Sequence, residues 1–145
     1  MTTPTLYIGD NFSDDPAGRY YTDGDGSGEE FREEVLKPLL SQLNSLEINI
    51  DKNVEGYGSS FLVEAFGGLV KHGYFTKDEV NSKINISYEN SDYEFYKRKI
   101  IKYINESHYN SEKYVSSKES AINSGVFKET IDKSFVRDIL NGTEK

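Results

Sequence analysis

The chain has 145 residues, 35% of them hydrophobic and 13% aromatic, which is enough for one domain with a modest extension. A net charge of −8 at pH 7 argues against a surface that binds nucleic-acid phosphates. The absence of cysteine excludes disulfides, thiolate zinc sites and cysteine nucleophiles. We see no signal-peptide pattern and no apolar run near the roughly 18 residues of a membrane span. We therefore expect a cytoplasmic protein that contacts neither membrane nor nucleic acid directly.

The first third of the sequence predicts two short strands and a long helix. Thr5–Ile8 and Arg19–Thr22 are short runs that favour strands, and we expect them to pair as an antiparallel hairpin. Ser27 and Glu30 have the spacing of a capping box, which predicts a helix start. Apolar residues follow at helical spacing up to Leu43, and Pro38 is expected to kink or divide this helix.

The middle of the sequence predicts a buried strand followed by an amphipathic helix. Leu46–Ile50 alternates apolar and polar residues, and the next helix is expected to begin at Ser59. Two adjacent glycines inside that helix, Gly67 and Gly68, indicate close packing against another backbone or a partner. The helical spacing also predicts an exposed row on this helix, formed by Ser60, Glu64, Gly67 and Lys71.

The last part predicts a short helix capped by Thr76, a strand over Ile84–Tyr88 and a helix from Asp92. A loop should follow, and apolar residues repeating every four positions then predict a terminal helix: Phe127, Ile131, Phe135 and Ile139. This order of elements favours an α/β fold with a mixed sheet faced by helices. We expect a domain over 1–106 and a C-terminal linker and amphipathic helix over 107–145.

Candidate sites concentrate around the second long helix. Ser59 and Ser60 open it, where their hydroxyls serve either as a helix cap or as a phosphate site near the positive end of the helix dipole. Two arginines flank an acidic loop and are expected to form a structural network or to hold an anion with nearby carboxylates: Arg19, Asp23, Asp25, Arg32 and Asp51.

Metal, cofactor and catalytic motifs were not found. The loop that contains Gly26 does not meet the calcium-loop spacing, and His72 and His108 fit no metal-ligand pattern. No nucleophile elbow or glycine-rich phosphate loop follows a strand. We therefore expect no metal, no cofactor and no enzymatic activity.

Three motifs resemble the bacterial STAS-like family of uncharacterised domains: FSxxPAGRY at 12–20, DGxxSGEEFR at 23–32 and GYGSSFLxEAFGGL at 56–69. The resemblance covers roughly residues 6–103 and implies a STAS-type fold. In the related anti-sigma-factor antagonists, a kinase with a histidine-kinase-like ATPase fold phosphorylates a serine that opens the helix after the central strand. By position, Ser59 or Ser60 resembles that serine, although Gly58 and Phe61 replace the Asp and Gly that flank it there.

The resemblance implies a regulatory, partner-switching interaction module whose partner is a protein, such as a histidine-kinase-like ATPase. The expected partner-binding residues lie on the second helix and the turn before it: Tyr57, Gly58, Ser60, Glu64, Gly67 and Lys71. The alternative is a small acidic inhibitor of phage type that blocks a host defence or nucleic-acid-handling enzyme. The oligomeric state stays open, a homodimer included.

Overall fold

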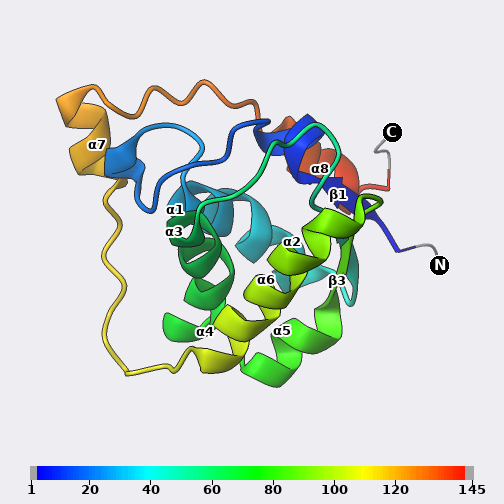
Figure 1. Cartoon of the computed structure of the whole chain (residues 1–145). Helices are drawn as coiled ribbons and strands as arrows, with labels where there is room; N and C mark the ends of the chain where they lie inside the picture. Colours follow the sequence, from blue (N-terminus) through cyan, green and yellow to red (C-terminus); the bar gives the residue numbers. More distant parts are fainter. Residues whose placement is uncertain (1–2, 143–145) are drawn as a thin grey trace.

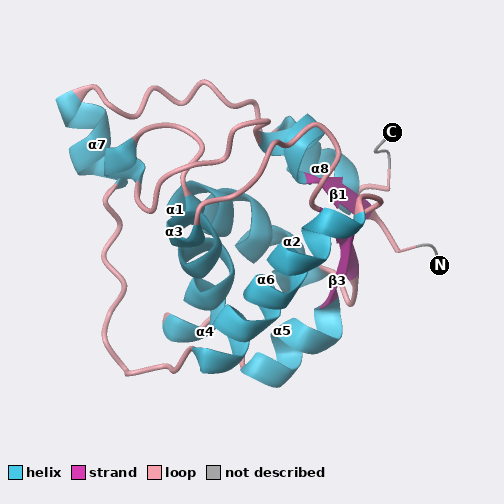
Figure 2. Ribbon diagram, viewed as in Figure 1, coloured by secondary structure: helices cyan, strands magenta, loops and turns pink. Residues whose placement is uncertain are grey.

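The computed structural model describes residues 3–142, in which three parallel strands form the sheet (Figures 1 and 2). The strands β1 (Thr5–Tyr7), β2 (Leu46–Asn49) and β3 (Ile84–Ser87) lie in the order β1-β2-β3. Three of the four expected strand positions are confirmed, whereas the mixed sheet is wrong because both strand pairs are parallel.

The strand expected over Arg19–Thr22 is absent, and a 3₁₀ turn, η2 (Tyr21–Asp23), lies there instead. The Asp23 carboxylate accepts hydrogen bonds from the backbone N–H groups of Arg19 and Tyr20 at 2.9 and 3.0 Å. The N–H of Tyr21 donates to Glu29 Oε1 at 3.0 Å. These carboxylates satisfy the donors that a strand pairing would use, so no hairpin forms with β1.

The two faces of the sheet differ in polarity. Leu6, Ile48 and Ile86 lie in register across the strands and are buried, because helices pack on this face. The intervening residues point to the opposite face and are mostly polar: Thr5, Tyr7, Glu47, Asn49, Asn85 and Ser87. Strand order 1-2-3 with right-handed helical connections places the helices on one face, as this pattern requires.

The first long helix runs from α1 (Gly28–Phe31) through a π-helical turn, η3 (Arg32–Leu36), into α2 (Lys37–Gln42). The cap is confirmed, because Ser27 Oγ accepts from the N–H of Glu30 at 3.1 Å. The Glu30 side chain reaches Gly26 N rather than Ser27 N. Pro38 does not end the helix, since the π turn directly before it changes the hydrogen-bond pattern where proline lacks a donor.

The second long helix has the same construction: α3 (Ser59–Leu62), a π turn η4 (Val63–Gly67) and α4 (Gly68–Lys71). Further along lie α5 (Lys77–Lys83), the 3₁₀ turn η5 (Ser91–Tyr93) and α6 (Glu94–Glu106). The Thr76 cap is confirmed by a reciprocal pair of hydrogen bonds with Glu79. No helix of the described residues is long and apolar enough to cross a membrane.

The single terminal helix expected from Phe127 to Ile139 is wrong, because two shorter helices, α7 (Lys118–Ser124) and α8 (Ser134–Leu140), flank an extended segment. Asp25 explains the difference: its carboxylate accepts from the N–H groups of Lys128 and Thr130 at 2.7 and 2.6 Å. These donors are therefore unavailable to a helix. Figure 1 shows this segment crossing the top of the molecule toward α8.

The C-terminal segment packs against the domain. The Phe127 ring meets Tyr21 edge-on with centroids 4.8 Å apart, and Ile139 joins the main core. Lys133 Nζ lies 2.7 Å from the buried carboxylate of Glu30. Burial alone would lower the pKa of this lysine, but its ion pairs with Glu30 and Glu34 outweigh burial and raise it.

Candidate functional site

The Ser59/Ser60 pair opens α3, but neither serine caps it. The N-cap is Gly58, with extended backbone angles (φ −81°, ψ 150°), and no side chain caps this end. The capping alternative is therefore wrong. Among the described residues neither hydroxyl has a hydrogen-bond partner, and Ser59 is exposed while Ser60 is half-buried. Both hydroxyls are thus left free at the positive end of a helix of three turns.

Tyr57 holds the turn in front of these serines in place. Its hydroxyl donates to the carbonyl oxygen of Ile50 at 2.7 Å, and its ring packs against Phe61 and Tyr96 with centroids 5.9 and 5.3 Å away. Burial, together with the nearby Tyr93 and Asp51, raises the pKa of Tyr57 far above its ordinary value. Tyr57 is therefore a neutral anchor between β2 and α6.

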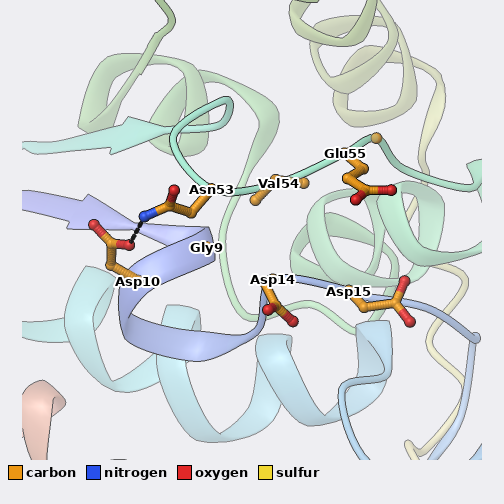
Figure 3. A pocket seen from close by; sticks show the side chains of 8 residues that line it. Gly9, Asp10, Asp14, Asp15, Asn53, Val54 and Glu55 are labelled. Carbon is orange, nitrogen blue, oxygen red and sulfur yellow. Dashed lines mark hydrogen bonds between the residues drawn. The ribbon is translucent and has the colours of Figure 1, made fainter.

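An acidic pocket of about 760 Å³ adjoins this turn, at the carboxyl ends of β1 and β2 (Figure 3). Ligands of parallel sheets commonly bind at such an edge. Asp10 Oδ1 accepts a hydrogen bond from Asn53 Nδ2 at 2.5 Å, and Asp10 Oδ2 forms an ion pair with Lys52 Nζ at 3.3 Å. The side chains of Asp14, Asp15 and Glu55 have no ion pair or hydrogen bond among the described residues, and Figure 3 shows them without a bond to the other residues drawn.

We did not predict this pocket from the sequence. Its signal was available, because Asp10 and Asp14 follow β1 while Asn53 and Glu55 follow β2, and parallel strands bring such loops together. Because we expected an antiparallel hairpin at the N-terminus rather than parallel pairing of β1 with β2, we did not expect these two loops to meet. No group of three or more potential ligands within residues 3–142 is arranged to hold a metal ion.

The expected exposed row on the second helix is wrong at its centre. Glu64 and Gly67 are buried, while Ser60 is half-buried and Lys71 exposed. A Cβ atom on Gly67 would lie 2.7 Å from Ser107 Oγ and 3.4 Å from the carbonyl oxygen of Tyr103. The glycine thus serves the close approach of α6, and the helix presents no continuous face to a partner.

Arg32 and Glu64 form a buried ion pair between the two long helices. The guanidinium is fully buried, and Nη1 lies 2.6 Å from Glu64 Oε2 and 2.8 Å from the Glu64 carbonyl oxygen. Nε donates to Glu33 at 2.8 Å, while Nη2 has no partner among the described residues. Burial would lower the pKa of Arg32, but both carboxylates outweigh it and raise it.

Two glycines make room for this pair. A Cβ on Gly28 would lie 2.6 Å from the Phe61 carbonyl oxygen and 2.9 Å from Glu64 Cβ. A Cβ on Gly68 would lie 2.6 Å from Arg32 Nη1. The two helices therefore approach closely enough for Arg32 to lie across the backbone of the other helix.

The network expected from the acidic loop divides into separate parts. Arg19 Nη1 lies 3.7 Å from Glu64, so both arginines converge on Glu64 rather than on the aspartates. Asp23 closes its own turn, and Asp25 binds the C-terminal segment. Asp51 accepts from the backbone N–H groups of Glu89 and Asn90 after β3. All three aspartates therefore stabilise loops.

His72 lies beside the Arg32–Glu64 pair, with Nε2 3.8 Å from Glu64 Oε2. Burial and the positive charge of Arg32 lower its pKa, and Glu64 opposes them only in part. Tyr114 covers this cluster from the linker between α6 and α7, its ring centroid 4.7 Å from that of His72 and 5.0 Å from Arg32 Cζ. His108 is exposed on the same linker.

The lowered pKa of His72 predicts a pH dependence of stability. Its folded-state pKa lies below the ordinary value of about 6.5, so its contribution is complete above that pH and is lost as the pH falls through the folded-state pKa. We expect the free energy of unfolding by urea to fall between about pH 7.5 and about pH 5.5, and to fall less in His72→Gln.

Glu30 titrates in the opposite sense, because burial raises its pKa, so the informative quantity is the difference between wild type and His72→Gln. A matched control is His108→Gln, whose side chain is exposed. Equal pH dependence in wild type and His72→Gln would contradict the prediction.

A family model described as a STAS-like domain of unknown function matches residues 27–94. This segment contains both long helices, β2 and β3, and with them the motif at 56–69 and the motif at 23–32 from Ser27 onward. The motif at 12–20 lies outside it. Comparisons with curated proteins and with solved structures found no significant match. Over residues 27–94, the chain is therefore similar to the STAS-like family.

Proposed function

We propose that the protein is a non-enzymatic regulatory module that binds a protein partner through the surface around Ser59, with Ser59 as the phosphorylated switch. The observation that carries this proposal is the free, exposed Ser59 hydroxyl on the first residue of a helix whose cap is Gly58. Ser60 is less accessible because it is half-buried. A STAS-like domain at this position supports a regulatory protein-interaction role.

A phosphate on Ser59 would change the charge of this surface. It adds about −1.5 to −2 charge at pH 7 beside a helix N-terminus and near a pocket that already presents Asp14, Asp15 and Glu55. Such a change repels an acidic partner surface and attracts one that carries arginines. The partner that we propose is a histidine-kinase-like ATPase, which phosphorylates Ser59 and is released by the product.

The test is intact-mass spectrometry after incubation with ATP and a histidine-kinase-like ATPase that phosphorylates anti-sigma-factor antagonists. We expect the added mass of one phosphate on wild type and on Ser60→Ala, and none on Ser59→Ala. The second measurement is capture of that ATPase by Ser59→Asp, which we expect to be weakened at least about tenfold.

Ser120→Asp is the matched control, because Ser120 is an exposed serine of α7 away from this surface. Equal capture by Ser59→Asp and Ser120→Asp would refute the switch. Phosphate added to Ser60→Ala and Ser59→Ala alike would refute the assignment of the residue.

The acidic pocket favours a second candidate, an inhibitor that occupies a basic nucleic-acid channel of a host enzyme. Its support is the three carboxylates without ion pairs among the described residues, together with the net charge of −8. Such binding should weaken steeply with added salt and compete with DNA or RNA. Binding that is insensitive to salt, or to substitution of both Asp14 and Asp15 by Asn, would exclude it.

A further inference from the structure

The linker between α6 and α7 forms a long strap along one side of the body, coloured yellow in Figure 1. Between Ser107 and Ser117 most of its side chains are exposed. Within the described residues, the polar contacts of the strap with α1 come from Tyr114 and Ser117, whereas Asn110 and Glu112 bond each other. The strap is thus held by a few side chains, and little of the core depends on the residues between them.

Tyr114 inserts into a site that the body provides. Its hydroxyl donates to Glu29 Oε2, and its ring lies against Arg32 and His72, with Tyr74 edge-on at 6.5 Å. A guanidinium over an aromatic face is favourable, and more so when both are desolvated. The body therefore provides the Glu29 carboxylate as an acceptor for the tyrosine hydroxyl and the Arg32 guanidinium as a cation against the tyrosine ring.

Glu29 gives the site its specificity. The carboxylate is buried and accepts from Ser117 Oγ at 2.5 Å, from Ser117 N at 3.1 Å and from Tyr114, besides its bond from Tyr21 N. Burial would raise the pKa of Glu29, but these hydrogen bonds outweigh burial and lower it. A buried carboxylate of this kind disfavours a ring without a hydroxyl, because Oε2 would keep only the bond from Ser117 N and lose the one from the tyrosine hydroxyl.

The walls of the site come from α1, η3 and the C-cap of α4, which the core positions and which lie within the STAS-like segment 27–94. The occupant comes from outside that segment. A cavity of about 440 Å³ beside Tyr114 separates the strap from the body, bounded by Tyr20 and Lys71 on one side and by Asn110 and Lys113 on the other.

We propose that Glu29, Arg32 and His72 form a recognition site for a tyrosine-bearing peptide segment, which Tyr114–Ser117 occupies in cis and which a partner segment of the same chemistry occupies in trans. The matching chemistry is a tyrosine followed three residues later by a serine. A short tether gives Tyr114 an effective concentration in the millimolar range, so the cis segment masks the site from weaker ligands. This site is distinct from the Ser59 surface, and its test does not depend on the proposed switch.

The test measures binding of a labelled peptide with the sequence of residues 110–118, NSEKYVSSK, to the full chain by fluorescence anisotropy. We expect Tyr114→Ala to bind this peptide at least about tenfold more tightly than wild type, because the cis competitor is gone. The peptide with Phe in place of Tyr should bind Tyr114→Ala at least about tenfold more weakly, and the Ala peptide more weakly still. Adding Glu29→Gln to Tyr114→Ala should weaken binding of the Tyr peptide.

Val115→Ala is the matched control, because Val115 is 80% exposed and should leave peptide binding at the wild-type level. Equal binding of the Tyr and Ala peptides to Tyr114→Ala, or no gain over wild type, would overturn the proposal. If Tyr114→Ala does not fold, Tyr114→Phe replaces it, since this variant keeps the ring and loses only the bond to Glu29. Tyr114→Phe should bind the Tyr peptide more tightly than wild type does, and failure to do so would equally overturn the proposal.

Discussion

Replacing Arg32 with Met is expected to lower the free energy of unfolding by about 3–5 kcal/mol, the cost of removing one partner of a buried ion pair. Methionine fills much of the volume of the arginine stem, so the loss comes mainly from charge. In the wild type, Arg32 Nη1 lies 2.6 Å from Glu64 Oε2 and is the nearest cation to this buried carboxylate. The substitution removes this cation and also the hydrogen bond from Arg32 to Glu33. Urea denaturation at pH 7 measures the change.

The double variant Arg32→Met with Glu64→Gln separates charge from packing. It removes both ends of the buried pair, so a substantial part of the loss should be recovered, since a buried pair replaced as a whole is often close to neutral. Arg98→Met is the surface control, because Arg98 forms an exposed pair with Glu94 at 3.4 Å, and it should change the unfolding free energy by less than about 1 kcal/mol. A double variant no more stable than Arg32→Met would contradict the charge argument.

Gly28→Ala is expected to lower the free energy of unfolding by about 3 kcal/mol, at the upper end of overpacking effects. The added methyl group would lie 2.6 Å from the backbone carbonyl oxygen of Phe61 and 2.9 Å from Glu64 Cβ. Because the first of these atoms belongs to a helix backbone, a side-chain rotation cannot relieve the clash. The long helices must move apart, which also lengthens the Arg32–Glu64 contact. Thermal or urea unfolding measures the loss.

Gly58→Ala is the matched control for this prediction. Gly58 has a negative φ of −81°, and a Cβ there would have no atom within 4 Å, so alanine is expected to change stability by no more than about 0.5 kcal/mol. If Gly28→Ala were as stable as Gly58→Ala, the close approach of the two long helices would not be required for the fold.

Elements that depend on local pattern could be predicted from the sequence. The alternation at Leu46–Ile50 predicted β2, because side chains of a strand point alternately to two faces. The Ser27 and Thr76 caps were predicted for the same kind of reason, since a cap involves residues three positions apart. The helix starting at Ser59 was also found, but of the two roles weighed for its serines the helix cap is wrong, because the cap is Gly58.

Features that depend on carboxylates outside the segment concerned were not predicted. Arg19–Thr22 has strand-like residues, but carboxylates of Asp23 and Glu29 take its donors. Phe127 and Ile131 repeat at helical spacing, but Asp25, about a hundred residues earlier, binds the backbone between them. In both places the intrinsic secondary-structure preference of the residues was overridden. Backbone N–H groups need an acceptor, and here side-chain carboxylates supply it in place of a strand or helix partner.

The sequence by itself determined where most strands and helices lie, which serines open the second long helix, and that the segment 27–94 is similar to the STAS-like family. Only the tertiary structure decided that Glu64 is buried, that both arginines converge on it, and that Tyr114 covers the cluster. The physical reason is range: helical and strand periodicity acts over a few residues, whereas burial and charge pairing are set by segments that meet only after the chain has folded.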